Sequence, residues 1–423
     1  MFYGWVQVWV TLAAGAFSSG AGFWAFTVFV TPMGDDLGWS RAELYGVMTI
    51  RALTSGALSP FMGPFQDSRL GPRIFAVATT LTMATSMIAM KWIDDLLLFY
   101  VVFGAFGALA NFGSTEMMMS VVIPRWFVRQ RGRALGIASM GTAMGPLLFP
   151  FIVTFLLAQL GWRDAWLALG LITLAVLGPI SLLVRTRPED MGLLPDGDDH
   201  PAPGVPAGLR ARVQSRERSF TRAEAVRMHC FWLLILAACF TTLGTGGFHA
   251  NWLPYFRDLG FSSAEGSMAA TAYGVCSLSS RVVWGWASER FELRLVMAVQ
   301  GLLTFVSVML FLNISSPATL LLATISNGLA LGGIFVMRPM IVANYFGRGH
   351  LGSINGIIRP FVTLANAGSP LLVALLYDRQ GSYEGVFLII AVGWLIAAAA
   401  TLLARSPQSG TPAQVTPSPA GVT

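Results

Sequence analysis

Four arginines lie inside long apolar stretches of the chain, where a charged side chain is unusual. They are Arg51, Arg281, Arg338 and Arg359, and the only acid at a comparable depth is Glu116. An ionisable side chain in the middle of a membrane costs at least about 2.5–3.5 kcal/mol on insertion scales, so each is a functional candidate. Four deep cations against one deep anion leave the interior net positive, which favours a negatively charged ligand.

Arg281 is the strongest candidate for binding such a ligand. It precedes Glu289 by eight residues, which places it about 12 Å from the cytoplasmic end of its segment at 1.5 Å per residue. A guanidinium group offers a planar fork of donors that matches a carboxylate. The alternative is a structural ion pair with Glu116, and both hold if an arriving anion displaces the acid. Arg51 lies nearer the outer end, where it could attract anions into a cavity or neutralise Glu116.

Glu116 and His249 are the two candidates for carrying a proton. A carboxyl group near an arginine can change protonation as an anion arrives and leaves, and imidazole titrates near neutral pH without help. The structural alternatives are a permanently ionised Glu116 and a hydrogen-bonded core His249. Asn111 and Asn251 are neutral hydrogen-bonding candidates for the ligand.

Arg338 and Arg359 precede Pro339 and Pro360 in two of the last three apolar segments. Both lie toward the cytoplasmic ends of these segments. Long side chains at such positions can extend to the membrane interface. We therefore expect a structural role for these two arginines.

The elements that position these residues are membrane-spanning helices. Of the 423 residues 55% are hydrophobic and 11% charged, against about 25% charged in soluble proteins. A spanning helix needs about 20 apolar residues. Twelve stretches meet that need, near 5–33, 43–65, 74–92, 96–122, 134–159, 165–184, 229–256, 265–287, 294–312, 318–343, 354–376 and 385–404. The predicted class is an all-α membrane protein with twelve transmembrane helices.

The net charge of +6 reflects topology rather than a nucleic-acid partner. With twelve alternating spans, eighteen arginines fall on one side and five basic residues on the other. Basic loops stay in the cytoplasm, so both termini are expected there, with the protein in a bacterial inner (plasma) membrane. The first apolar stretch is too long for a cleavable leader and reads as the first span. The three cysteines show no metal spacing, and there is no Walker loop or catalytic constellation, so we expect no cofactor, no metal and no enzyme activity.

Two halves of the chain repeat at a nearly constant offset. Ser40 recurs as Ser262 and Gly63 as Gly285, both 222 positions on, while Trp126-Phe127 matches Tyr345-Phe346 at 219. This predicts a parallel repeat of two six-helix bundles. The expected units are 1–184, a cytoplasmic linker 185–228, 229–405 and a disordered tail 406–423. The end of the linker, 219–228, could form a short amphipathic helix.

The loop between the second and third segments, Gly63-Pro-Phe-Gln-Asp67-Ser-Arg69-Leu-Gly-Pro-Arg73, resembles the signature loop of the major facilitator superfamily. A degenerate copy, Gly285-Trp-Ala-Ser-Glu289-Arg290, stands in the second half. We hypothesise that Asp67, with Arg133 or a neighbour, latches the cytoplasmic gate against arginines and a helix N-terminus of the other half. The candidate gating residues are Asp67, Arg69, Arg73, Arg133, Glu289 and Arg290. The alternative is a solvated topology signal.

Three further stretches resemble the monocarboxylate transporter group, and also the oxalate–formate exchanger group. They are residues 273–281, ending at Arg281, residues 126–138, and residues 187–193. The resemblance implies that Arg281 binds a substrate carboxylate. One departure matters: the animal carriers have a lysine in the first helix and this chain has no charge there, so their proton scheme does not carry over.

The favoured function is a secondary transporter, working as a monomer, that moves a small organic anion by alternating access. A monocarboxylate is the favoured class, with a proton or a counter-anion as the coupled partner. One alternative is efflux of an amphipathic compound through a cavity lined by the aromatic residues Phe23, Trp24, Phe26, Phe248 and Trp252. Another is a substrate-sensing receptor on a transporter scaffold.

Overall fold

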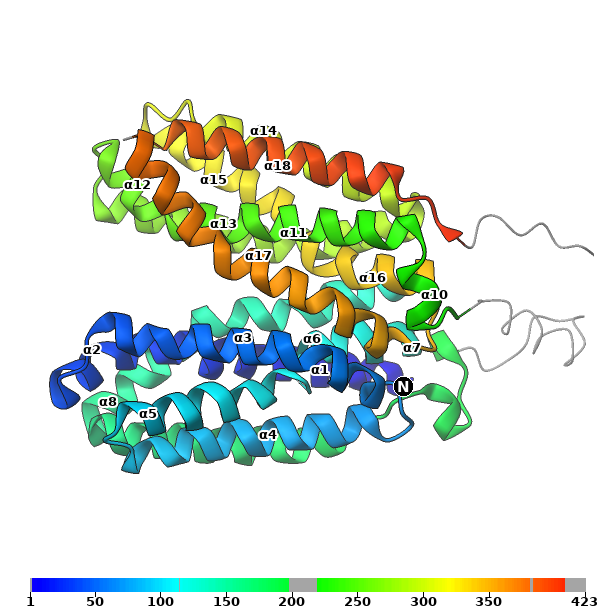
Figure 1. Cartoon of the computed structure of the whole chain (residues 1–423), viewed down its shortest axis with the longest axis horizontal. Helices are drawn as coiled ribbons and strands as arrows, with labels where there is room; N and C mark the ends of the chain where they lie inside the picture. Colours follow the sequence, from blue (N-terminus) through cyan, green and yellow to red (C-terminus); the bar gives the residue numbers. More distant parts are fainter. Residues whose placement is uncertain (1, 114, 198–218, 381–382, 408–423) are drawn as a thin grey trace, which may run out of the picture.

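The computed structural model describes residues 2–113, 115–197, 219–380 and 383–407. The middle of the expected linker, 198–218, and most of the expected tail lie outside these residues. The described part is helical, without strands. Figure 1 shows two stacked layers of long helices, the first half of the chain below and the second half above.

The helices of the first half follow the predicted segments. They are α1 (Tyr3–Ser19), which continues through a π-helical turn (Gly20–Trp24) into α2 (Ala25–Leu37); α3 (Arg41–Gln66); α4 (Gly71–Ala89); an irregular helix from α5 (Leu96–Phe99) through α6 (Thr115–Met117) to α7 (Ile123–Trp126); and α8 (Arg131–Leu182). The 52-residue α8 holds the fifth and sixth spans, because Gly161 breaks it with φ 73° and ψ 169°. That left-handed φ favours glycine, so the turn between the two spans is set at this residue.

The second half repeats this order. After the short α10 (Arg222–Val226) come α11 (His229–Ala250) and α12 (Trp252–Asp258), α13 (Ser263–Arg290), α14 (Leu293–Phe311), α15 (Pro317–Leu331) and α16 (Ile334–Phe346), α17 (Leu351–Gln380), and α18 (Glu384–Leu403). The repeat extends to helix starts: Ser40 with Glu43 and Ser262 with Glu265 form capping boxes at α3 and α13. Such a box satisfies two backbone donors at once, which fixes the first turn. The twelve-helix architecture is confirmed.

Among the described residues, eight helical segments are long and apolar enough to cross a membrane by composition alone. One of them is α8, which holds two spans. Two long helices, α3 and α13, fall short of this composition. Both lie at the contacts between the two halves, where polar and small residues replace apolar ones.

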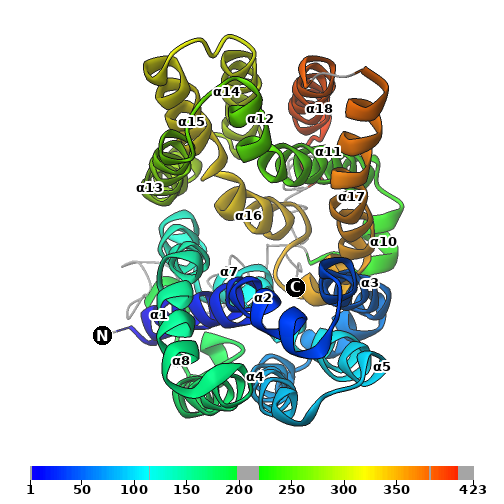
Figure 2. The same cartoon turned by 90° about the vertical axis from the view of Figure 1, so that its left-hand side faces the viewer.

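The two halves meet at two seams, α3 against α17 and α8 against α13. Figure 2 shows these contacts on opposite sides of the molecule with α16 between them. Each seam rests on a glycine pair. A Cβ on Gly63 would lie 2.4 Å from the Gly352 carbonyl oxygen, and one on Gly132 would lie 2.1 Å from that of Gly285. Backbones this close leave no room for any side chain.

Both glycine pairs lie near one end of the helices, which we call the basic face because the loops there carry Arg69, Arg125, Arg185 and Arg348. Figure 1 shows the halves meeting near this face and diverging toward the ends of α2 and α12. The structure is therefore closed at the basic face.

Candidate functional site

A cavity of about 690 Å³ lies between the two halves, on the side of the seams away from the basic face. Its walls come from α1, the fourth span and α8 of the first half, and from α11, α13, α15, α16 and α17 of the second. Three residues predicted from the sequence line it, namely Asn111, Glu116 and His249, and Arg338 and Arg359 line it as well. Arg51, Asn251 and Arg281 are not among the lining residues.

Glu116 forms an ion pair with Arg359 across the two halves, with 3.1 Å between Oε2 and Nη2. The arginine is 18% exposed and the acid 63%, so the acid faces the open cavity. Arg359 also donates to the Asn111 carbonyl at 3.4 Å and lies 5.5 Å from the centre of the Phe112 ring. The alternative pairing of Glu116 with Arg281 or Arg51 is not what this state shows, because these two guanidinium groups bond elsewhere.

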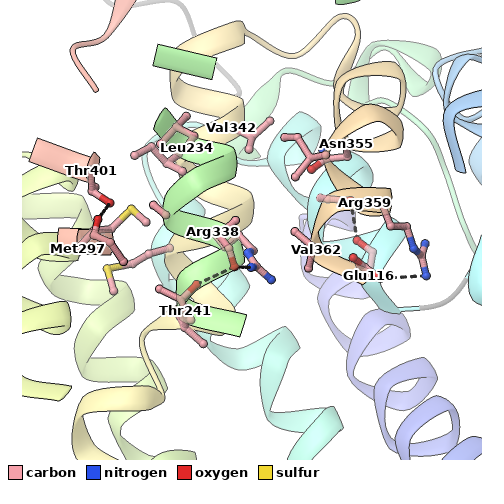
Figure 3. A pocket seen from close by; sticks show the side chains of 18 of the residues that line it. Glu116, Leu234, Thr241, Met297, Arg338, Val342, Asn355, Arg359, Val362 and Thr401 are labelled. Atoms are coloured by element: carbon pink, nitrogen blue, oxygen red, sulfur yellow. Dashed lines mark hydrogen bonds and ion pairs between the residues drawn. The ribbon is translucent and has the colours of Figure 1, made fainter. Parts of the chain in front are cut away.

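Arg338 approaches the same acid from α16 (Figure 3). Its Nη2 donates to the Ala238 carbonyl and to the Thr242 hydroxyl, both at 2.7 Å, so α11 holds the side chain in place. We expected Arg338 and Arg359 to extend to the interface. Both instead line the cavity. Arg359 reaches Glu116 of the other half, whereas Arg338 is bonded to α11 of its own half.

Arg281 lies directly behind the cavity wall. It is 4% exposed, and its Nη1 donates to the Ser139 carbonyl and to the Thr142 hydroxyl of α8, the latter at 2.9 Å. The Phe335 ring covers it, with 4.4 Å between Cζ and the ring centre. Thr142 and Phe335 themselves line the cavity. Arg281 therefore joins the α8–α13 seam in this state and lies one side chain away from the cavity.

Neither Arg51 nor Asn251 lines the cavity in this state. Arg51 donates from Nη1 to the Gly22 carbonyl at 3.2 Å and lies 5.7 Å from the Phe103 ring centre, within the first half. Asn251 stands at the junction of α11 and α12. The structure does not bring either residue together with Glu116.

His249 lies on the opposite wall, at the start of a buried hydrogen-bonded chain. Its Nε2 is 3.4 Å from Asn327 Oδ1, and Asn327 Nδ2 donates to Ser307 Oγ at 2.8 Å. Ser307 donates its own proton to the Thr304 carbonyl. The serine must therefore accept from the amide, which turns Oδ1 toward His249 and requires a proton on Nε2. A second proton can bind only at Nδ1.

The candidate gating residues separate into two groups. Asp67 accepts from the backbone N–H groups of Gly352 and Ser353 at 2.8 Å, and from the Ser353 hydroxyl at 2.7 Å, at the N-terminus of α17. Its positive partner is Arg125 and not Arg133, with 2.9 Å between Asp67 Oδ1 and Arg125 Nη2. The Arg125 side chain is only 2% exposed. Arg125 also donates to the Arg348 carbonyl at 3.2 Å.

At the second seam Glu289 takes the equivalent place. It accepts from the Arg133 backbone N–H at 2.7 Å and pairs with the Arg133 side chain at 3.1 Å. The remaining gating candidates do not cross between the halves: Arg69 pairs with Asp190, Arg290 lies over Trp286, and Arg73 stands in the first turn of α4.

Sequence reasoning missed two buried arginines, Arg125 and Arg131, because both read as loop charges. Arg131 is 1% exposed and donates to the Asn344 side chain and to the Pro124 carbonyl. It also missed Asp196, whose carboxylate accepts the backbone N–H groups of residues 128–130 just before α8. Its φ of 62° is left-handed, a conformation that Asp tolerates better than most residues.

Residues 12–257 and 234–423 match the profile of the Major Facilitator Superfamily. The oxalate:formate antiporter of Oxalobacter formigenes is 24% identical over 88% of this chain and 85% of its own length. Monocarboxylate transporter 11 of Homo sapiens is 24% identical over 84% of this chain and 71% of its own. Among solved structures, the chain is similar to a bacterial homologue of the iron transporter ferroportin in its outward-facing state, with a TM-score of 0.71. The match covers 95% of this chain and 99% of that one. At 14% identity it shows the fold alone. The two matched ranges together reach from residue 12 to the C-terminal end, and the chain belongs to the Major Facilitator Superfamily of transporters.

Proposed function

We propose that this transporter moves a small organic anion, with a monocarboxylate as the favoured class, coupled to a proton or a counter-anion. The observation that carries the proposal is the Glu116–Arg359 pair, which joins the two halves across the cavity. A carboxylate from the protein already occupies the place where a carboxylate ligand would bind. The names of the two relatives, both carriers of carboxylates, support the same class.

The pair provides a mechanism of exchange. An arriving anion competes with Glu116 for Arg359, and Arg338 adds a second positive charge nearby. The displaced carboxylate then faces a new negative charge, so proton uptake becomes more favourable. Displacement also removes one bond between the halves. Binding is thereby linked to their relative motion.

Arg281 has a separate place in this cycle. Its bonds to Ser139 and Thr142 cross the α8–α13 seam. If the seam opens at the basic face, these acceptors are lost, and the buried guanidinium needs a replacement. A bound carboxylate supplies it. The basic face is the cytoplasmic side in this proposal, with both termini there and the protein a monomer in the inner membrane.

His249 is the second proposed proton site. The chain through Asn327 keeps Nε2 protonated and leaves Nδ1 as the position that titrates. The titratable group facing the ring is Tyr273 of α13, with 4.8 Å between ring centres, while Glu116 and Arg338 line the same cavity. A protonated His249 would add positive charge to the cavity and so favour binding of the anion.

Uptake of labelled mono- and dicarboxylates into proteoliposomes tests the proposal, with and without a pH gradient and with and without internal anion. We expect uptake by the native protein and a loss of about a hundredfold in kcat/KM for Arg359→Gln, the scale of a broken charge-assisted pair. Arg257→Gln, an exposed arginine of the same half, is the control. Absence of carboxylate uptake, or uptake indifferent to Arg359, contradicts the proposal.

Glu116→Gln distinguishes the two modes of coupling. If Glu116 carries the proton, the variant loses uptake driven by a pH gradient and keeps anion exchange. Unchanged dependence on the pH gradient assigns the proton elsewhere, with His249→Gln as the next variant.

The efflux alternative receives less support. Of the aromatic residues expected to line a drug-binding cavity, Phe26, Phe248 and Trp252 are buried in the cores of the two halves. Trp252 packs on Phe311 with ring centres 5.0 Å apart. These rings are committed to packing in this state.

A further inference from the structure

A second cavity of about 90 Å³ begins at the contact between the halves, beside the first, and extends into the C-terminal half. The two share lining residues around the ion pair, namely Glu116, Ser120, Ile334, Arg338, Asn355 and Arg359. From Arg338 the second cavity continues past α11 and α16 to α14 and α18. Figure 3 shows lining side chains from Met297 and Thr401 at one end to Glu116 and Arg359 at the other.

The far part of this second cavity is mainly apolar, and its two polar side chains, Gln300 and Thr401, donate hydrogen bonds within their own helices. We call it the apolar slot and define it by Leu234, Met297, Gly301, Trp394, Ala397 and Ala398. Transport by exchange at the ion pair needs only the charged end of the cavity. The slot is therefore unexplained by the mechanism above, although it opens beside both arginines.

The N-terminal half has a corresponding cavity that is largely filled. It measures about 30 Å³ and is lined by neutral residues of α1, α4, the fourth span and the end of α8. The repeat shows what differs. Thr79 of this cavity stands 222 positions before Gly301, and Leu177 stands 220 positions before Ala397. At these two positions the second half carries the smaller residue, whereas Trp394 and Ala398 match the smaller Leu174 and Gly178, so the repeat accounts for the difference in volume only in part.

We infer that the apolar slot holds the hydrocarbon tail of the transported anion, whose carboxylate lies at Arg338 and Arg359. The substrate class is then a monocarboxylic acid with an aliphatic or aromatic body of several carbons. A two-carbon dianion would leave the slot empty. The inference rests on the proposed function and narrows it, because the charged end and the apolar slot are one continuous cavity.

The chain-length dependence of binding tests this inference. Acetate, butyrate, hexanoate and octanoate are titrated against the purified protein in nanodiscs, with tryptophan fluorescence or thermal stabilisation as the readout. Transfer of a methylene group from water into an apolar site corresponds to about fourfold in Kd. We expect Kd to fall by about that factor per methylene until the slot is full.

Two variants locate the effect. Ala397→Leu installs the residue that the N-terminal half carries at the matched position, and it is expected to remove the gain for hexanoate and octanoate while leaving acetate unchanged. Met297→Ala enlarges the slot and should move the optimum to a longer acid. Val299→Leu on the same helix α14 is the control, because Val299 is 50% exposed on the outer surface of its half.

The possible outcomes are distinct. If no acid binds at any length, the proposed function fails and the inference fails with it. If acids bind with the same affinity at all lengths, or if Met297→Ala and Ala397→Leu alter acetate and octanoate equally, the function stands and the slot is not the tail site. Because Met297→Ala removes atoms without adding bulk, it keeps the test decisive even if Ala397→Leu does not fold.

Discussion

The two seams between the halves are built alike and bonded differently. Both α3–α17 and α8–α13 rest on a glycine pair. At the first, Asp67 accepts three hydrogen bonds from the N-terminus of α17 and pairs with the buried Arg125. At the second, Glu289 pairs with Arg133, whose side chain is 51% exposed.

This difference indicates that the two seams have different roles. The first seam concentrates charge-assisted hydrogen bonds in a water-poor place, where they are strongest. The second seam has a weaker acid–base contact and instead holds Arg281, which has Ser139 and Thr142 as partners there. We infer that the α3–α17 seam stabilises the closed basic face, while the α8–α13 seam carries the arginine that can respond to a ligand.

Substitution at the glycine pairs should have the largest effect on closure and transport. The effect should be equal at the two seams. Gly63→Val and Gly132→Val each place atoms within 2.4 Å of an opposing carbonyl oxygen, so we expect loss of the closed state and of transport. Spin labels at the exposed Leu70 and Phe291 measure the separation of the halves.

Gly274→Ala is the matched control for these variants, because a Cβ there meets nothing within 4 Å. A Gly63→Val protein that still shows the short distance between labels would contradict the idea that backbone contact defines closure.

Asp67→Asn should have the second-largest effect on the closed state and on transport. It leaves Arg125 buried without a counter-charge, a situation that costs about 3–5 kcal/mol when a buried pair is broken, and it weakens three hydrogen bonds. We expect the closed population and the transport rate to fall by about two orders of magnitude. The same spin labels and the uptake assay measure both.

A double variant sharpens this result. Adding Arg125→Met to Asp67→Asn removes the orphaned charge and should recover part of the closed population. If the double variant is as open as Asp67→Asn alone, the uncompensated arginine is not the cause.

Glu289→Gln should have a much smaller effect. Arg133 is half exposed, so its ion pair contributes about 1 kcal/mol or less, and a glutamine oxygen can still accept the Arg133 backbone N–H. We expect a change of fivefold or less in the open-to-closed ratio. An effect as large as that of Asp67→Asn would mean that the two seams are equivalent, against the comparison above.

Asp196→Ala should have the smallest effect on transport and a local effect on structure. The carboxylate covers the N–H groups that precede α8, the first-half helix of the second seam, and caps of this kind contribute about 1 kcal/mol. Amide exchange at residues 128–130 should accelerate about fivefold, measured by mass spectrometry. Asp196→Asn, which keeps an oxygen acceptor and tolerates the left-handed φ, should restore most of the protection.

The sequence was sufficient for the fold, because apolar segment length and the Ser40–Glu43 repeat are local properties. It also singled out Glu116 and Asp67, both of which bond to the other half in the structure. The sequence alone could not show which arginine forms an ion pair with each of these acids. Arg281 lies nine residues before the end of α13 and Arg359 eight residues after the start of α17, and only the rotation of each helix decides which of them faces Glu116. Arg125 looked like a loop charge because burial there is created by the opposing half.

The low hydropathy of α3 and α13 has a consequence for biogenesis. A helix enters lipid from the translocon according to its own apolar content, and these two carry little of it. Each becomes stable in the bilayer only when a neighbour covers its polar side. For α3 that neighbour is α17, which is synthesised near the end of the chain, so early integration of α3 must depend on temporary partners.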